Sequence, residues 1–196
     1  MLRLWTIQDK AAYDDFLNKG VLQCHPSLAM WLNEESFKRS YDWLVTQMCK
    51  RIDSPPEGVS YPIWAWYLIH GQNVKPDLRR YEFRNYVGEN YIIEAEIPDS
   101  EVLLSDEEMW HIVLNNGYFS VYEREAEWSA DYDWFDSLPL EEQSSVKLSS
   151  WERIFDQTYC PWMHVQASFW SLRKENVVSV RRFLGRQQPV LIASVK

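Results

Sequence analysis

Three side chains suited to binding or catalysis lie late in the chain, in the run V-Q-A-S-F-W at positions 165–170. Side chains of a strand alternate between two faces, so Gln166, Ser168 and Trp170 would share one face. Two hydrogen-bonding groups beside an aromatic ring could form the floor of a ligand cleft. A solvent-facing part of a sheet would show the same pattern.

A run of aromatic residues, Y-P-I-W-A-W-Y at positions 61–67, is the second candidate. Trp64 and Trp66 would project from one face of a strand and Tyr67 from the other. Exposed rings can stack on a nucleobase or a nicotinamide ring at about 1–3 kcal/mol per ring, whereas buried rings fill a core. Arg79 follows in a polar segment, where its guanidinium could bind a phosphate or lie on the surface.

Acidic side chains offer two further patterns. Glu94 and Glu96 would lie on one strand face about 7 Å apart, which suits either the acid and base of glycoside hydrolysis or the solvated face of an edge strand. Ser105, with Glu108 three residues later, predicts a capping box at a helix N-terminus. The adjacent Asp106 is then left open for a binding role.

The sequence lacks the common cofactor and metal motifs. It has only 6 glycines and no glycine-rich phosphate loop, so a nucleotide would have to be bound by side chains. The four histidines lie far apart, and we expect no metal site. The three cysteines show no C-x-x-C spacing and are typical of reduced thiols in a cytoplasmic protein.

Length and charge indicate one globular domain spanning residues 1–196. The 29 acidic and 20 basic residues give a net charge of −9, which argues against a broad basic surface for duplex DNA but is compatible with a small basic pocket. No apolar run approaches the roughly 18 residues of a membrane span, and the N-terminal segment lacks the pattern of a signal peptide. We therefore expect a cytoplasmic protein without a membrane partner.

The elements that would position these residues follow an irregular order. Apolar runs predict strands at 2–7, 61–69, 91–97, 163–172 and 190–195, and a weaker strand or short helix at 177–184. Helical spacing predicts helices between Asp9 and Gly20, over 34–52, after Ser105 and over 140–155. Irregular alternation of this kind predicts an α+β fold. The acidic, aromatic stretch at about 120–138 is expected to form a surface excursion.

Four motifs resemble those of a bacterial family labelled only as a domain of unknown function. They are L-W-T-I-Q, Y-P-I-W-A-W-Y, E-I-P-D-S-E-V-L-L-S-D and V-Q-A-S-F-W. The likeness covers nearly the whole chain, and it implies no established activity.

The layout is also similar to the DarT-like branch of the ADP-ribosyltransferases, which use NAD as a substrate. That branch has a strand with a Thr, then a helix, then Gly before a hydrophobic pair, as at Thr6 and at 20–22 in this chain. Its aromatic strand after a Pro resembles 61–67, and its hydrophobic run before an acid resembles 102–106. The resemblance implies an ADP-ribosyltransferase-like fold, a single domain with a split, mixed β-sheet flanked by helices.

This resemblance implies a set of residues that bind NAD, with no metal. The set comprises Thr6, Gln8 and Arg79 at the ribose and phosphates, Trp64, Trp66 or Tyr67 at the nicotinamide ring, and Asp106 and Trp170 as further members. The family's catalytic Gln-Ala-Glu pattern aligns with Gln166, Ala167 and Ser168. Serine cannot stabilise a developing oxocarbenium ion as a carboxylate does. Either Gln166, Glu94 or Glu96 then takes that role, or the fold keeps a nucleotide pocket without transfer.

Two functions follow as expectations. An active protein would transfer ADP-ribose to a nucleic acid or a protein, as a toxin or phage-defence effector with an antitoxin-like partner. The alternative is a non-catalytic binding module with an aromatic cleft for a peptide or a nucleotide. In that case the stretch 123–142, where acids surround aromatic residues, would carry the partner contacts.

Overall fold

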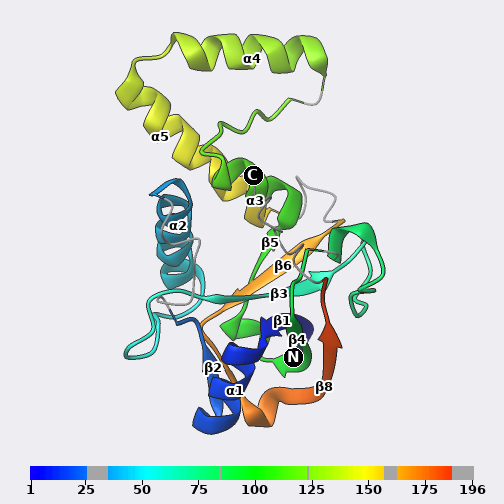
Figure 1. Cartoon of the computed structure of the whole chain (residues 1–196). Coiled ribbons are helices and arrows are strands. Elements are labelled where there is room, and N and C mark those ends of the chain that lie inside the picture. The colour runs from blue at the N-terminus through cyan, green and yellow to red at the C-terminus, as the bar shows by residue number, and fades with distance from the viewer. Residues whose placement is uncertain (26–34, 84, 123, 157–162, 187–196) are drawn as a thin grey trace, which may run out of the picture.

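A six-stranded sheet forms the centre of the protein (Figure 1), in a computed structural model that describes residues 1–25, 35–83, 85–122, 124–156 and 163–186. Its spatial order is β5 (Leu103–Asp106), β6 (Val165–Phe169), β3 (Ile63–Leu68), β1 (Leu2–Asp9), β4 (Glu89–Ile97) and β8 (Val177–Leu184). Although a mixed sheet was expected, every ladder between these strands is antiparallel, and the parallel pairing described is an isolated bridge between Val87 and Arg186.

A second, two-stranded sheet pairs β2 (Val21–Gln23) with β7 (Ser171–Arg173), so the strands are divided between two sheets. The helix α1 (Lys10–Lys19) connects β1 to β2. Asp9 caps this helix by accepting a hydrogen bond from the Ala12 N–H at 2.8 Å. Gly20 ends it with a φ of 79°, a left-handed conformation that glycine adopts without strain. Both ends of this helix agree with the sequence prediction.

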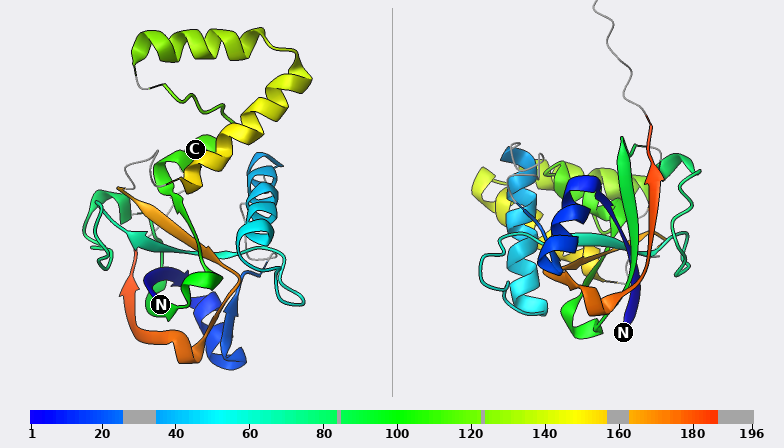
Figure 2. Two further views of the ribbon diagram at one scale, coloured as in Figure 1. Left: turned by 180° about the vertical axis from the view of Figure 1, so that it is seen from behind. Right: turned by 60° about the horizontal axis from the view of Figure 1, so that its bottom comes forward.

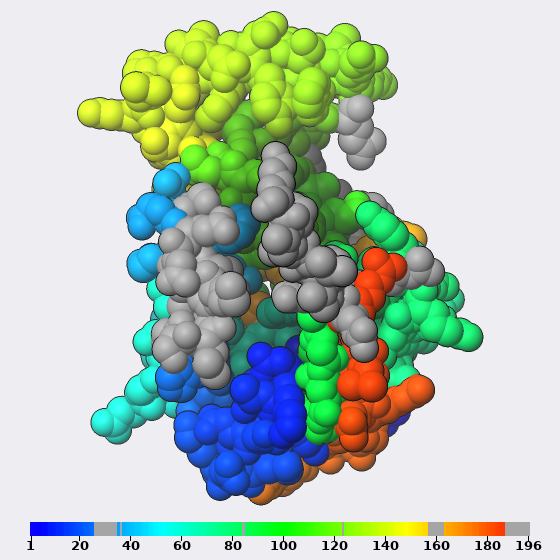
Figure 3. Space-filling model, viewed as in Figure 1, coloured from blue at the N-terminus to red at the C-terminus, as the bar shows by residue number. Residues whose placement is uncertain are grey.

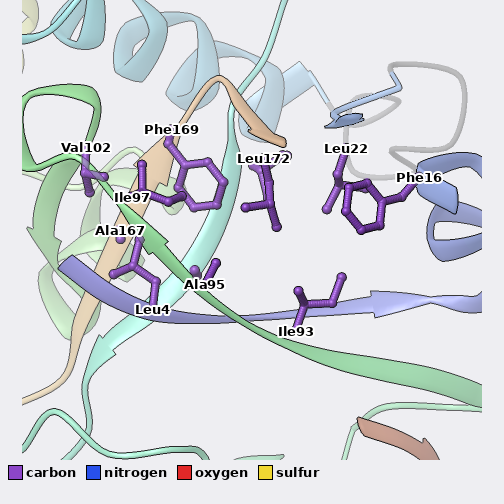
Figure 4. Packing of buried hydrophobic residues seen from close by; sticks show 12 residues of the cluster. Leu4, Phe16, Leu22, Ile93, Ala95, Ile97, Val102, Ala167, Phe169 and Leu172 are labelled. Carbon is purple, nitrogen blue, oxygen red and sulfur yellow. The ribbon is translucent and has the colours of Figure 1, made fainter. Parts of the chain in front are cut away.

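One face of the large sheet, here called the α1 face, packs against α1 and the small sheet. Leu4, Ala95 and Ala167 come from three different strands and belong to one buried cluster with Phe16 of α1 and Leu22 of β2 (Figure 4). Ala95 and Ala167 are at most 1% exposed, so small side chains lie where the layers approach most closely. This cluster is the main core of the protein.

The opposite face, here called the Trp64 face, has two different covers. Over β5 and β6 it packs against α2 (Glu35–Arg51), α3 (Glu107–Leu114) and η5 (Glu152–Phe155), around the fully buried Trp151. Over β1 and β4 it packs against the segment 70–88, which includes η3 (Tyr81–Phe83). Two further single turns, η4 (Asp99–Glu101) and η6 (Lys174–Asn176), join strands at the sheet's ends.

The helices α4 (Glu125–Ser137) and α5 (Leu140–Trp151) extend from the body as an arm, which Figure 2 shows from behind. The expected surface excursion at 120–138 therefore contains a helix that the sequence analysis did not predict. The Tyr118 ring stacks on Phe135 with centroids 4.2 Å apart, and its hydroxyl donates to Asp131 at 2.9 Å. These contacts hold α4 against the chain that precedes it.

The remaining predicted strands and helices are confirmed within a few residues, except that the strand predicted at 163–172 is divided into β6 and β7 and that the helix cap after β5 was wrong. The strand predicted at 190–195 lies outside the described residues. Asp106, not Ser105, caps α3 by accepting from the Met109 N–H at 2.9 Å. Ser105 stays in β5, opposite Gln166, whose amide Nε2 donates to its hydroxyl at 3.1 Å. α3 therefore begins one residue later than a cap at Ser105 would place it.

We predict that Asp106→Ala lowers the free energy of unfolding by about 1–2 kcal/mol, because the Met109 N–H loses its acceptor. Asp106→Asn keeps a side-chain acceptor and should recover most of that loss. Glu108→Ala, at an exposed position, should change the free energy by less than about 0.5 kcal/mol. Chemical denaturation of the three variants measures this. A large loss in Glu108→Ala would instead favour the capping box.

Candidate functional site

The two strands β1 and β3 meet along a very short stretch. Trp5 and Trp66 form the one register pair between them, and both strands lie wholly within the described residues. β1 and β4, by contrast, pair from Leu2 to Asp9. Beside the short stretch, the buried Thr6 hydroxyl donates to the Trp64 carbonyl at 2.9 Å, and the Gln8 amide donates to that hydroxyl at 2.7 Å. Hydrogen bonds from side chains thus replace backbone hydrogen bonds where the pairing of β1 with β3 ends.

A cavity of about 180 Å³, here called the wedge cavity, lies at this end of the two strands. Its walls come from β1, α1, β2, α2 and β3. The polar and aromatic residues that line it are Gln8, Asp9, Asp15, Gln23, Cys24, His25, Tyr41 and Trp64. Trp64 is 36% exposed, so it offers an accessible ring at the cavity. The volume is below the range of about 300–1,000 Å³ for whole drug-sized ligands, and it suits one ring with its substituents.

The charge of the wedge cavity favours neutral or cationic groups. None of its described lining residues is a lysine or an arginine. The Asp9 carboxylate caps α1, and Asp15 is paired with Lys19 at 2.9 Å. Burial raises the pKa of Tyr41 to about 12 and also raises the pKa of the Cys24 thiol, so both groups are neutral at pH 7. A phosphate would find little attraction inside this cavity.

The three predicted aromatic residues of β3 have different surroundings. Trp66 shares the Trp64 face but is 8% exposed, with its ring between Trp64 at 5.5 Å and Phe83 at 5.4 Å. Tyr67 packs on the α1 face with the main core. Only Trp64 of these three both lines the wedge cavity and is exposed.

Gln166 and Ser168 lie on β6, directly opposite Trp66 and Trp64 of the neighbouring strand β3. Both are buried, at 6% and 1% exposure, and the Gln166 amide is bound to Ser105. They therefore share a sheet face with Trp64 without reaching the open cavity. Neither is among the residues that line the wedge cavity.

Trp170 and Asp106 have structural partners away from the wedge cavity. Trp170 packs in the helical cluster, and its indole N–H donates to the Asp53 carbonyl at 2.7 Å. Asp106 caps α3, and burial raises the pKa of its carboxyl despite the hydrogen bond from the Met109 N–H. These contacts account for both side chains as parts of the fold.

The carboxylate pair of β4 is held by one arginine. Arg3 binds Glu96 at 2.7 Å and approaches Glu94 at 3.6 Å, and the Ser179 hydroxyl also donates to Glu94. Glu94 and Glu96 do share one face, as predicted. β4 lies three strands from β6, about 14 Å at the usual strand spacing. Glu96 and Gln166 are therefore not brought together.

Arg79 lies in the segment 70–88, outside the wedge lining. Its guanidinium forms a two-pronged contact with Asp77, at 2.9 and 2.8 Å, and its side chain is 90% exposed. The side-chain hydrogen bonds from Arg79, followed by the bond from its backbone N–H, lower the pKa of Asp77 to about 2. The guanidinium N–H groups of Arg79 that would suit a phosphate are thus already hydrogen-bonded to a carboxylate.

Six of the polar and aromatic residues that line the wedge cavity were not predicted as site residues: Asp9, Asp15, Gln23, Cys24, His25 and Tyr41. Cys24 and His25 follow β2 directly, and Tyr41 belongs to α2. No motif in the sequence marks the adjacent Cys24 and His25 as site residues. Nothing in the neighbouring sequence indicates that α2 lies beside the end of β1.

In the part of the chain described here, no group of three histidine, cysteine or acidic residues could hold a metal ion. No helix within these ranges is long and apolar enough to span a bilayer.

The fold and this cavity define an α+β domain with a six-stranded antiparallel sheet, a second two-stranded sheet and a small cavity lined by side chains. A family model described as "Domain of unknown function (DUF3841)" matches residues 3–178, and the chain belongs to that family. Searches of the curated proteins and of the solved structures find no match. The family is thus the one expected from the four motifs, and the likeness to ADP-ribosyltransferases stays a prediction.

We predict that Arg79→Gln raises the pKa of Asp77 from about 2 toward the ordinary value of 3.8, because the largest cause of the lowering is removed. The backbone N–H of residue 79 should retain part of the effect. Since the folded-state pKa is lowered, the contact stabilises its turn above the ordinary pKa and is lost as the pH falls toward 2.

An NMR titration of the Asp77 carboxyl carbon measures this shift. Arg80→Gln is the matched control, since Arg80 acts on Asp77 only as the weakest of the causes. An equal pKa of Asp77 in the wild type and in Arg79→Gln would contradict the two-pronged contact.

Proposed function

We propose that this protein binds NAD, with the nicotinamide ring and its ribose entering the wedge cavity. The observation that carries the proposal is the exposed Trp64 ring at a small cavity without lysine or arginine. In oxidised NAD the nicotinamide ring is positively charged, so it gains from an aromatic face and from nearby carboxylates. The negatively charged phosphates would point out of the cavity.

The resemblance to ADP-ribosyltransferases also supports the wedge cavity as the place where NAD binds. Two of the residues that the resemblance assigns to NAD, Gln8 and Trp64, line the wedge cavity, and a third, Thr6, is hydrogen-bonded to both. The division of the strands into two sheets agrees with the split sheet that this resemblance implies. The polar edge of a nicotinamide carboxamide could replace Thr6 as the partner of the Gln8 amide.

The positions of the candidate catalytic residues argue against transfer of ADP-ribose. Ser168 stands where a catalytic carboxylate was expected, and it is buried. Glu96 is ion-paired with Arg3 three strands away. Gln166 and Ser168 carry no carboxylate, and those of Glu94 and Glu96 are paired with Arg3, so we infer that the protein binds NAD without transferring it.

Trp64→Ala should weaken NAD binding at least about fivefold, because a stacked ring contributes about 1–3 kcal/mol. Isothermal titration calorimetry and the change in melting temperature with NAD measure this effect. Trp128→Ala is the matched control, because it also removes a partly exposed indole, on α4, and should bind NAD as the wild type does.

The same preparations should be incubated with labelled NAD and a cell extract. The proposal predicts binding without label transfer. Transfer that Gln166→Ala abolishes would show an active enzyme instead. Absence of binding at millimolar NAD, or equal binding by Trp64→Ala and the wild type, would overturn the proposal.

The arm formed by α4 and α5 favours a second candidate function, a binding module for a protein partner. Trp128 and Trp134 of α4 are each 47% exposed, on a helix whose charged residues are all acidic. Figure 3 shows this arm as the upper end of the molecule, away from the sheet. A partner with a basic segment would match both its charge and its rings.

Pull-downs with the intact protein and with the double variant Trp128→Ala, Trp134→Ala test this module. We expect a partner captured by the intact protein to be lost from the variant and retained by Trp64→Ala. Unchanged recovery in the double variant would remove the arm as the contact surface.

A further inference from the structure

A second cavity, here called the loop pocket, lies at the opposite end of β3 from the wedge cavity. It has a volume of about 380 Å³ and is lined by Ile69, His70, Gln72, Lys75, Asp77 and Arg80, together with Val74. Its residues belong to the segment after β3, beside the end of β8 in Figure 1. Five residues of strand separate Ile69 from Trp64, about 17 Å, so the two cavities are distinct.

The wall of the loop pocket is fixed from two sides. His70 has a φ of 51°, an uncommon left-handed conformation for a residue other than glycine. Its ring nitrogens contact Glu82 at 3.3 Å and the His164 ring at 3.1 Å. The Gly71 N–H donates to the Met163 carbonyl at 2.6 Å. These contacts tie the pocket to the chain just before β6, so its shape is set before a ligand arrives.

Positive charge predominates at the loop pocket, although the whole chain has a net charge of −9. Lys75 is exposed and forms no ion pair with any residue that the structure describes. Among the described residues, the Arg80 guanidinium forms one ion pair, a long contact of 3.9 Å with Glu82. The Asp77 carboxylate is already bound by both prongs of Arg79. Two cationic side chains therefore face the pocket with little local compensation.

We propose that the loop pocket binds a phosphomonoester, with Lys75 and Arg80 as its charged contacts. A lysine ammonium supplies a point charge, and an arginine guanidinium can donate two parallel hydrogen bonds to phosphate oxygens. The Gln72 amide and the His70 ring add polar groups around the same volume. The wedge cavity differs in charge, because its lining has no lysine or arginine.

A phosphomonoester could come from a free nucleotide or from the 5′ end of a nucleic acid. This inference does not rest on NAD binding in the wedge cavity, and either proposal can fail alone. The probes are inorganic phosphate, AMP, adenosine, and one short oligonucleotide prepared with a 5′-phosphate and with a 5′-hydroxyl. Binding is measured by isothermal titration calorimetry at low salt.

We expect AMP and inorganic phosphate to bind the wild type and adenosine to bind far more weakly. Lys75→Gln and Arg80→Gln should each weaken AMP binding about tenfold, which is typical for loss of one charge-assisted contact. Lys50→Gln removes an exposed charge at the end of α2 and should have no effect. Trp64→Ala should bind AMP as the wild type does, which separates this site from the wedge cavity.

The oligonucleotide pair identifies the source of the phosphate. Binding of the 5′-phosphate form at least as tightly as AMP would indicate a nucleic-acid end, and binding of AMP alone would indicate a free nucleotide. No binding of any phosphate probe at millimolar concentration would overturn the proposal. Equal AMP affinity in Lys75→Gln, Arg80→Gln and Lys50→Gln would overturn it as well.

Discussion

The short contact between β1 and β3 is the constraint on which the rest of this structure depends. The backbones of the two strands pair at Trp5 and Trp66. Beyond that pair, hydrogen bonds of the Thr6 and Gln8 side chains connect the strands. Since a buried carbonyl must be hydrogen-bonded, the Thr6 hydroxyl lets the sheet end its pairing there without leaving the Trp64 carbonyl unsatisfied. The strands can then open toward α1 and β2, and the wedge cavity occupies that opening.

Local patterns predicted most of the fold. The helix from Asp9 to Gly20 had a capping acid and a terminal glycine, and β4 had clear alternation. The cap of α3 was misassigned because serine and aspartate both cap helices, and the sequence does not show that the Ser105 hydroxyl binds the Gln166 amide of the neighbouring strand. α4 was missed because its acidic and aromatic residues form no continuous apolar stripe.

The candidate site was less predictable, since long-range contacts decide which side chains are available. Gln8 and Trp64, which the resemblance assigns to NAD, both line one cavity, whereas Glu96 is bound by Arg3, which lies 93 positions away in the sequence. Arg79 is bound by the nearby Asp77, and Trp66 is buried by Phe83. Composition had indicated that any nucleotide would have to be bound by side chains. The structure has a cavity without lysine or arginine and a basic pocket at opposite ends of β3.

The most direct test of this account is a ¹⁵N-resolved NMR titration with nicotinamide riboside, which carries the charged ring and no phosphate. We expect the Trp64 indole N–H and the Gln8 side-chain amide to shift in a saturable way, while the indoles of Trp128 and Trp134 stay unchanged. Assignment by Trp64→Phe identifies the first signal. A titration in which only the arm indoles move, or in which no indole moves at millimolar ligand, would contradict the wedge cavity as the binding site.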